Sequence, residues 1–521
     1  MHNVVDGDLT MALTPNGLDA PRQGMMDSSA ELVAGSVNPI SAVAWERRTA
    51  TPPLITALPG NPVLPLGEFD YEKRDYQVDE FIVSGAATSF TLCKPARADG
   101  QLVAAANDSA KYVTRYVVVR PSASESFNGT VFVEWLNVTS GADAPVTWMG
   151  AHREILRSGS AWVGVSAQKA GIVGDESVPG MALPLTKVDS GRYGKLLHPG
   201  DSFAFDMFSQ AAEALKSDDL SNQLLGDLVA QRVIGVGQSQ SAVYLTTYVN
   251  AVDPRACAYD GFLVHSRMGP GASLSANQQS DALKFMPKYM PFRADLRVPV
   301  LCLVTETDLV GSTLSGYAGA RRSDTPTLRV WEVPGTAHVD GYLLNGALVD
   351  NGKVPYEQFA RLFRPSTTVP SIGVDLAKPY NSGEAHHYVL QAGVRAIDLW
   401  LRTGQAPVST LPIKLTHDGG EFTFDADDIG IAKGGVRTPW TDVPTTRLSG
   451  VGNSGGFIGS LVGVSELLTS VELEALYPGG KADYLMRFTA STHTAITMGH
   501  LLVEDRAEIL AIADINYQGV P

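Results

Sequence analysis

The sequence predicts an α/β fold: a mostly parallel central sheet with helices on both of its faces. Short apolar runs of strand length recur along the chain, and stretches with helical periodicity separate many of them. Strands that alternate with helices form parallel sheets, because each crossover must bring the chain back to the same edge. Several of these runs are apolar throughout, which is typical of strands that are covered on both sides.

The predicted elements follow one another from residue 79 onwards. The first two strands are separated by a polar, turn-rich stretch at 96–109. The predicted strands span 79–91, 112–121, 130–136, 161–167, 233–236, 259–265, 298–305 and 328–333. The predicted helices span 148–157, 201–216, 385–403, 465–476 and 502–513, and another follows the turn at 237–241.

The predicted sheet gives a domain organisation. Residues 1–60 are rich in Pro, Gly, Ser and Ala without periodicity, so we expect an irregular arm. Residues 61–404 form the core. Two insertions interrupt it, near 169–200 and 266–296, and the second is rich in Met and aromatic residues. Such a segment is usually packing, but in a hydrolase it can also form a cap over an acyl pocket. Residues 405–521 are expected to be a C-terminal elaboration that packs on the core.

Charge and composition restrict the possible partners. The 521 residues include 40 Lys and Arg against 55 Asp and Glu, a formal net charge of −15. An acidic surface argues against nucleic acid or an anionic membrane as the main partner. The chain shows no apolar segment of about 18 residues, so no membrane span is expected.

Three cysteines, Cys93, Cys257 and Cys302, are too few for a disulfide framework and fit a reducing compartment. The N-terminus lacks the basic and apolar regions of a secretory signal. We therefore expect a cytoplasmic protein.

The stretch 232–250 carries the strongest chemical signal. An apolar strand leads into Gly237-Gln238-Ser239-Gln240-Ser241, and apolar residues at helical spacing follow. This is the nucleophile-elbow pattern G-x-S-x-G with serine in its last place. A sharp turn there exposes the Ser239 hydroxyl and needs small residues two positions away on either side. The alternative is an ordinary turn in which Ser239 or Ser241 caps the helix.

An activated serine needs a base and an acid that orients the base. In the α/β-hydrolase fold they follow the serine in the order acid, then histidine. Glu306 and Asp308 come directly after the strand at 298–305, and His338 follows the strand at 328–333. The pattern favours Asp308, which lies deeper in the loop, and leaves Glu306 open because of its longer reach.

Other histidines are weaker candidates. His265 ends a strand and could line a pocket, whereas His198 is expected to brace a turn before a helix. His386 and His387 are adjacent, so they point to different faces of a helix and make a poor ligand pair. We expect no metal and no cofactor.

An oxyanion hole needs two backbone N–H donors. The first is expected from Gln240, which follows the candidate nucleophile. The second should come from the loop after the strand at 130–136, from Asn137 or Val138. Asn137 could instead close that loop with its side chain.

Together these stretches resemble the large bacterial α/β-hydrolase-domain proteins, a branch of the serine-hydrolase superfamily with a GxSQS-type elbow. The resemblance covers about residues 80–515. It implies one catalytic domain, with the nucleophile at Ser239, the base at His338 and the acid within the TETD segment; it implies no particular substrate. Ser241 departs from the general superfamily pattern but fits this branch. The motifs are VEWLNVTSG at 133–141, ILRSGSAWVGVSAQ at 155–168, LHPGDSFAFDMFSQA at 197–211, GQSQSA at 237–242, TETDL at 305–309, GTAHVDGY at 335–342 and GGVRTPWTDVP at 434–444.

The sequence therefore predicts a serine hydrolase that cleaves a carboxylic ester of a small molecule, with a hydrophobic or aromatic portion suggested by the Met-rich insertion. Two alternatives stay open: an acyltransferase with the same triad, and a non-catalytic binding protein on the same fold. The sequence does not determine the oligomeric state.

Overall fold

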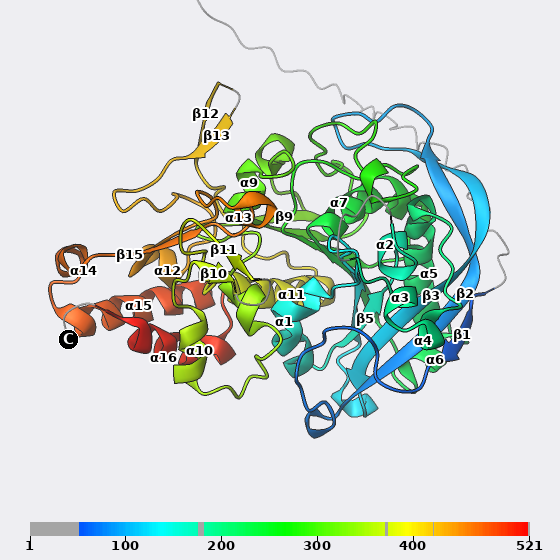
Figure 1. The fold of residues 1–521 in the computed structure, drawn as a ribbon, viewed down its shortest axis with the longest axis horizontal. Helices are drawn as coiled ribbons and strands as arrows, with labels where there is room; N and C mark the ends of the chain where they lie inside the picture. Colours follow the sequence, from blue (N-terminus) through cyan, green and yellow to red (C-terminus); the bar gives the residue numbers. More distant parts are fainter. Residues whose placement is uncertain (1–51, 176–181, 370–372, 420, 519–521) are drawn as a thin grey trace, which may run out of the picture. The chain divides into compact units, whose positions relative to one another are not determined.

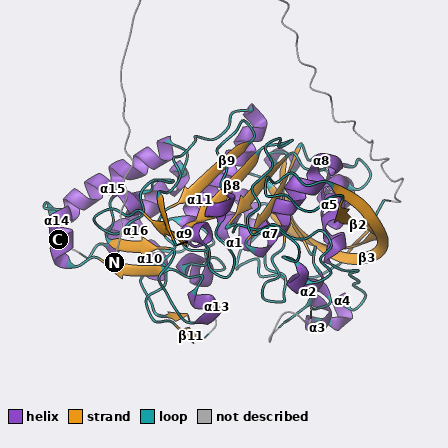
Figure 2. Ribbon diagram, turned by 90° about the horizontal axis from the view of Figure 1, so that it is seen from above, coloured by secondary structure: helices purple, strands orange, loops and turns teal. Residues whose placement is uncertain are grey.

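The computed structural model describes residues 52–175, 182–369, 373–419 and 421–518. The predicted arm at 1–60 lies mostly outside these residues. Its last part contains the first strand, β1. The α/β-hydrolase fold is confirmed by a nine-stranded, mostly parallel sheet with helices packed around it (Figures 1 and 2). The strands are β1 (Leu54–Ala57), β2 (Tyr76–Leu92), β3 (Ala104–Pro121), β4 (Thr130–Trp135), β5 (Ala161–Val165), β6 (Arg232–Gln238), β7 (Gly261–His265), β8 (Val300–Thr305) and β9 (Leu328–Val333).

The sheet has the order β1-β2-β3-β5-β4-β6-β7-β8-β9. The pairs β1–β2, β2–β3 and β3–β5 are antiparallel. From β5 onwards every pair is parallel, so the carboxyl ends of β4, β6, β7, β8 and β9 lie along one edge. Residues that follow these strands in sequence are thereby collected at that edge.

Successive side chains of β4 point to opposite faces of the sheet, and their contacts identify the helices that cover each face. Glu134 accepts hydrogen bonds from the backbone N–H groups of Thr147 (2.7 Å) and Trp148 (2.9 Å), at the start of helix α1 (Val146–Arg157). Trp135, which points the other way, contacts rings of α5 (Ala204–Lys216) and α7 (Gln240–Thr247). Helix α11 (His386–Thr403) packs against α1. The two faces of the sheet are therefore covered by different helices, as predicted.

The remaining elements are shorter or lie after the core. The short helices are α2 (Lys169–Ile172), α3 (Leu185–Val188), α4 (Ser190–Tyr193), α6 (Ser221–Leu225), α8 (Asp253–Ala256), α9 (Glu306–Val310), α10 (Tyr356–Leu362), α12 (Pro439–Asp442), α13 (Gly456–Gly459) and α14 (Ser470–Leu476). Two longer helices, α15 (Gly480–Thr497) and α16 (Arg506–Asn516), follow. Three two-stranded sheets pair β10 (Thr368–Val369) with β11 (Val374–Asp375), β12 (Leu415–Asp418) with β13 (Glu421–Phe424), and β14 (Thr446–Ser449) with β15 (Val464–Leu467).

Several predicted elements are wrong in detail. Strand β3 begins at Ala104, inside the stretch predicted as turns, because its start pairs with the end of β2. The helix predicted at 465–476 is strand β15 followed by α14, since Val464–Leu467 pair with β14. Helix α15 was not predicted. In each case, pairing or packing with a distant segment overrides local composition.

The residues after α11 share a core with the sheet. One apolar cluster contains Phe132 of β4, Trp148 of α1, Val389 of α11, Phe488 of α15 and Ile509 of α16. The C-terminal segments and the core thus bury apolar surface against each other. The division into 61–404 and 405–521 remains a prediction.

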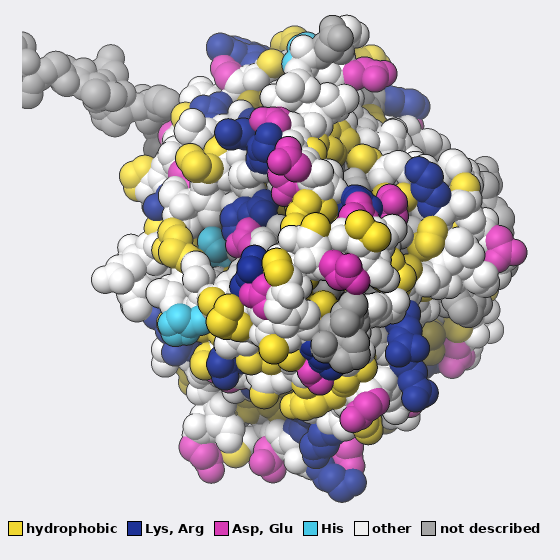
Figure 3. Space-filling view, turned by 90° about the vertical axis from the view of Figure 1, so that its left-hand side faces the viewer, with side chains coloured by type: hydrophobic (Ala, Val, Ile, Leu, Met, Phe, Trp, Pro, Cys, Tyr) yellow, Lys and Arg dark blue, Asp and Glu magenta, His cyan; other side chains and the backbone are white. Residues whose placement is uncertain are grey.

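On the face shown in Figure 3, Lys and Arg side chains are interspersed with Asp and Glu side chains. Within the described part of the chain, none of the helices is both long and apolar enough to cross a membrane.

Candidate active site

Ser239 occupies the turn between β6 and α7. Its backbone has φ 57° and ψ −119°, a conformation that L-residues seldom adopt. The backbone N–H of Ser239 donates to the carbonyl of His265 (3.2 Å), which fixes the turn to the end of β7. A Cβ on Gly237 would lie 3.2 Å from the carbonyl oxygen of Ser241, so the turn leaves little room there. This strained, close-packed turn presents the hydroxyl above the sheet edge.

The capping alternative does not describe this turn. Ser239 is the N-cap residue of α7, but its side chain makes no capping hydrogen bond. Its hydroxyl Oγ lies 2.7 Å from Nε2 of His338 instead. The hydroxyl of Ser241 donates to Oε1 of the Gln240 side chain, at 3.5 Å.

His338 connects Ser239 to a buried carboxylate. Its Nδ1 lies 2.5 Å from Oδ1 of Asp308. His338 is 3% exposed and Asp308 is fully buried. A carboxylate only accepts hydrogen bonds, so Nδ1 carries the proton and Nε2 presents its lone pair to Ser239. The structure thus brings these three side chains into one hydrogen-bonded chain.

Asp308 and Glu306 have different partners. The second oxygen of Asp308 accepts from the backbone N–H (3.0 Å) and hydroxyl (2.5 Å) of Thr305, which makes a capping box at the start of α9. Glu306 points elsewhere: it accepts from the N–H groups of Gly335 (2.7 Å) and Gly450 (2.8 Å), and burial raises its pKa. Asp308 therefore orients the imidazole, and Glu306 ties together the loops around it.

Gly450, from the C-terminal residues, is part of this brace and was not anticipated from the sequence. Its carbonyl accepts from the hydroxyl of Thr307 (2.5 Å), which in turn accepts from the backbone N–H of His338 (3.1 Å). A Cβ on Gly450 would lie 2.6 Å from Cβ of Glu306 and 2.4 Å from the carbonyl oxygen of Thr336. Only a glycine allows this close approach, and no local sequence pattern indicates it.

The oxyanion candidates named from the sequence differ in whether their backbone N–H groups are already engaged. Gln240 is the first residue of α7, so its N–H has no intrahelical partner. Among the residues that the structure describes, the N–H of Val138 makes a single long contact of 3.4 Å, to Oε1 of Gln240. The N–H of Asn137 donates to the carbonyl of Ala144 (3.0 Å), and its side chain donates to the carbonyl of Gln238 (3.2 Å). Asn137 thus closes the loop, and Val138 is the candidate that remains.

A buried polar network lies beneath these donors. The side-chain amide of Gln240 donates to Oε1 of Gln168 (2.6 Å), which also accepts from the indole of Trp135 (3.0 Å). Gln168 donates to Asp201 (3.1 Å), which also accepts from the hydroxyl of Tyr244 (3.1 Å), and burial raises the pKa of Asp201 to about 6. Gln168 carries no sequence motif of its own, and its position after β5 is the only signal that could have indicated it.

The two other histidines differ in setting. Nε2 of His198 contacts the carbonyl of Ala167 (2.9 Å), its Nδ1 accepts from the N–H of Gly200 (3.2 Å), and burial lowers its pKa to about 4. His198 therefore braces its loop, as expected. His265 lies at the end of β7, where Nε2 contacts the hydroxyl of Thr147 (3.0 Å). Burial lowers the pKa of His265 well below its ordinary value.

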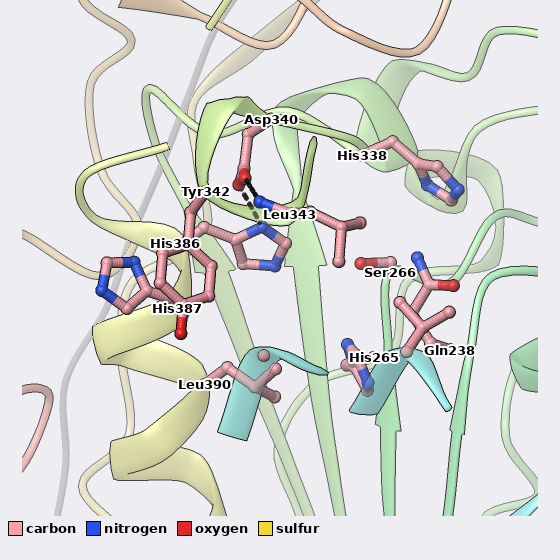
Figure 4. Close-up of a pocket in the computed structure, with 12 residues that line it drawn as sticks. Gln238, His265, Ser266, His338, Asp340, Tyr342, Leu343, His386, His387 and Leu390 are labelled. Carbon is pink, nitrogen blue, oxygen red and sulfur yellow. Dashed lines mark hydrogen bonds and ion pairs between the residues drawn. The ribbon is translucent and has the colours of Figure 1, made fainter. Parts of the chain in front are cut away.

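A pocket of about 310 Å³ lies beside His338 (Figure 4). His265, Ser266 and Gln238 lie on one side of it, and His386, held by Asp340, lies across from them. The lining residues are Val146, Gly150, Gln238, His265, Ser266, His338, Asp340, Tyr342, Leu343, His386, His387 and Leu390.

Of the Met- and aromatic-rich insertion, Ser266 alone is among these lining residues. Met290 and Phe292 are buried, and Phe285 is 94% exposed. The cap remains a prediction. Among the residues that the structure describes, no group of three or more His, Cys, Asp and Glu could hold a metal ion.

The strand order, the serine at a strained strand-to-helix turn and the Ser–His–Asp chain are those of an α/β hydrolase. The chain belongs to this family: a sequence model described as "Alpha/beta hydrolase domain" matches residues 40–511. No curated protein sequence matches the chain.

Solved structures resemble it weakly. A glucuronoyl esterase from Solibacter usitatus is 14% identical, with 52% of this chain and 72% of that chain covered, at a TM-score of 0.28. Acetyl xylan esterase 1 from Thermoanaerobacterium sp. JW/SL YS485 is 11% identical, with 56% and 84% covered, at a TM-score of 0.29. Likeness at this level carries no argument about function.

Proposed function

We propose that this protein is a serine hydrolase that cleaves carboxylic esters, with Ser239 as nucleophile, His338 as general base and acid, and Asp308 as the triad acid. The observation that carries the proposal is the hydrogen-bonded chain: 2.7 Å from Ser239 to His338 and 2.5 Å from His338 to Asp308. The strained backbone at Ser239 supports it, because strain of this kind concentrates at active sites.

Acylation uses the lone pair on Nε2 of His338. This nitrogen removes the proton from Ser239 as Oγ attacks the ester carbonyl carbon, and a tetrahedral oxyanion forms. The imidazolium is stabilised by the carboxylate of Asp308, which stays ionised. His338 then gives its proton to the alkoxide oxygen, the alcohol leaves, and an acyl group remains on Ser239.

The oxyanion is held by the backbone N–H groups of Gln240 and Val138. The long 3.4 Å contact between the N–H of Val138 and the side chain of Gln240 makes that donor easy to redirect. The network through Gln168 fixes the Gln240 side chain while its backbone N–H stays available. Each such donor typically contributes about 10²–10³-fold to the rate.

Deacylation repeats these steps with water. His338 removes a proton from a water molecule, whose oxygen attacks the acyl carbon, and then returns the proton to Ser239 Oγ as the acid leaves. The scheme needs no cofactor or metal. The proposed substrate is a small-molecule ester, and the proposed location is the cytoplasm, which the three unpaired cysteines favour.

Labelling with a fluorophosphonate tests the proposal directly. Intact mass and peptide mapping should find one adduct, on Ser239, and the adduct should be lost in His338→Ala. Ser241→Ala is the matched control, because Ser241 lies two residues away on the same turn. An adduct on another residue, or none on a folded protein, would overturn the proposal and favour a binding protein on this fold.

A further inference from the structure

The pocket beside His338 has an unusual concentration of unpaired polar atoms. Four of its lining side chains have a buried polar atom with no hydrogen-bond partner in the described part of the chain. Native proteins satisfy most buried polar atoms with protein groups or ordered water, so a cluster of four at one pocket indicates a place where a polar partner can bind. The atoms are His265 Nδ1, Ser266 Oγ, His386 Nε2 and His387 Nε2, in residues that are 2%, 0%, 8% and 2% exposed.

The hydrogen-bonding character of two of these atoms follows from their rings' other contacts. Nδ1 of His386 lies 3.0 Å from a carboxylate oxygen of Asp340, and Nδ1 of His387 lies 3.2 Å from the carbonyl oxygen of Gly383. Both oxygens accept only, so both Nδ1 atoms carry the proton. In the neutral rings, each Nε2 therefore carries a lone pair. The ring of His386 lies toward Ser266, whereas the ring of His387 is stacked on Tyr342 and lies farther from Ser266 (Figure 4).

Ser266 adds a group that can both donate and accept. It follows β7 and has φ 49°, a strained conformation for a residue other than glycine. Strain at such a position is held in place by the surrounding fold and is typical of functional sites. Ser266 and His386 lie on opposite sides of the pocket (Figure 4), so one small group between them could contact both.

A hydroxyl group fits this arrangement. It can donate to Nε2 of His386 and accept from the Ser266 hydroxyl at the same time. An apolar group would leave both protein atoms unpaired. A carboxylate has no proton to donate to the imidazole lone pairs, and it would lie near the carboxylate of Asp340.

The position of His338 indicates which part of the ester lies here. His338 lines the pocket, whereas Ser239 and the oxyanion candidates Gln240 and Val138 are not among its lining residues. In the proposed reaction, His338 hands its proton to the leaving oxygen, so the alcohol part lies on the His338 side.

We propose that this pocket selects esters whose small alcohol part carries a free hydroxyl group, with His386 and Ser266 as the residues that determine this specificity. The inference rests on the proposed ester hydrolysis and names the substrate class of the same site. It differs from the hydrophobic or aromatic portion that the sequence suggested.

The test compares 2-hydroxyethyl butyrate with propyl butyrate, which differ by one hydroxyl in place of a methyl. The wild-type protein should prefer the hydroxyethyl ester in kcat/KM by about tenfold or more, because a site built to bind a hydroxyl rejects its absence. His386→Asn keeps an N–H near Asp340 but removes Nε2, and it should bring the ratio close to one. Ser266→Ala should lower the ratio in the same direction.

His493→Asn is the matched control, since His493 is exposed on α15, and it should keep the wild-type ratio. A wild-type ratio near one, or a preference that survives both pocket variants, would overturn the inference. A preference for 3-hydroxybutyrate over butyrate esters, without one for the hydroxyethyl alcohol, would overturn its assignment to the alcohol part.

If neither ester is cleaved, the result contradicts the proposed ester hydrolysis and leaves the inference about the pocket to a binding experiment. Binding of the two esters to Ser239→Ala, measured by calorimetry, then decides the inference. Tighter binding of the hydroxyethyl ester supports it, and equal or weaker binding overturns it.

Discussion

Two buried Asp–His pairs stand beside the same pocket, and they differ in what faces the second nitrogen of the imidazole. In both pairs a carboxylate contacts Nδ1, at 2.5 Å for Asp308–His338 and 3.0 Å for Asp340–His386. Nε2 of His338 lies 2.7 Å from the Ser239 hydroxyl, whereas Nε2 of His386 has no partner among the described residues. A carboxylate fixes the tautomer of either ring, and the neighbour of Nε2 decides whether the pair can activate a nucleophile.

The two carboxylates are also held alike. The second oxygen of Asp308 accepts from the backbone N–H of Thr305, and the second oxygen of Asp340 accepts from the N–H of Leu343 (2.9 Å). Each aspartate thus accepts from a backbone N–H three residues away, before it in the chain for Asp308 and after it for Asp340, while it contacts a histidine. The same local device serves the proposed chemistry in one pair and the proposed selection of substrate in the other.

The largest expected effect comes from Asp308→Asn. The amide would donate to Nδ1 of His338, move the proton to Nε2 and remove the lone pair that Ser239 needs. We expect kcat to fall by about 10⁴-fold. Steady-state kinetics with propyl butyrate measure the loss of kcat. An unchanged rate of fluorophosphonate adduct formation, followed by mass spectrometry, would contradict the prediction.

Glu306→Gln distinguishes the role of Glu306 from that of Asp308, the other carboxylate that follows β8. Glu306 accepts from two backbone N–H groups, so the amide would leave one of these buried donors facing an NH₂ group. We expect the free energy of unfolding to fall by about 3 kcal/mol at pH 7, with a much smaller loss of kcat than in Asp308→Asn. Urea titration and kinetics on the same preparation test this. A loss of activity as large as that of Asp308→Asn, in a stable protein, would make Glu306 the triad acid.

His387 is the neighbour of His386 but has no carboxylate on Nδ1, and burial lowers its pKa from 6.5 to about 3. A lowered histidine pKa means that the unfolded chain binds more protons, so stability is lost as the pH falls below 6.5. His387→Phe removes the titratable imidazole while keeping a ring against Tyr342. Its stability relative to wild type should rise by about 2 kcal/mol between pH 7 and pH 5.

Urea titrations of the wild type and of His387→Phe at pH 7 and pH 5 give the difference in their free energies of unfolding. The contributions of the other buried histidines are the same in both proteins and cancel in this difference. A difference that does not change with pH would show that folding does not lower the pKa of His387.

Asp340→Asn gives the smallest expected effect. It makes the same change in the Asp340–His386 pair that Asp308→Asn makes in the Asp308–His338 pair. The amide would reverse the tautomer of His386 and turn its Nε2 into a donor. Since the ester hydroxyl and Ser266 can exchange their donor and acceptor roles, we expect kcat/KM for 2-hydroxyethyl butyrate to fall by no more than about tenfold relative to propyl butyrate. A loss near that of Asp308→Asn would mean that the second pair takes part in the chemistry itself.

Much of the fold could be predicted from the sequence because it depends on local patterns. The strands β4 to β9 are short apolar runs, and the elbow at Ser239 combines small residues with a strand-to-helix change. The predictions failed where pairing with another segment determines the secondary structure: the start of β3 pairs with β2, and Val464–Leu467 pair with β14. Their own composition does not specify those partners.

The sequence by itself determined the order Ser239, then the TETD segment, then His338, and it predicted that all three lie at one sheet edge, since residues that follow parallel strands must gather there. Only the tertiary structure decided that Asp308 rather than Glu306 contacts the imidazole, that Gly450 braces the loops, and that Asp340 and His386 form a second pair. These contacts join residues from separate segments. Their geometry depends on side-chain direction and packing, which a one-dimensional pattern does not contain.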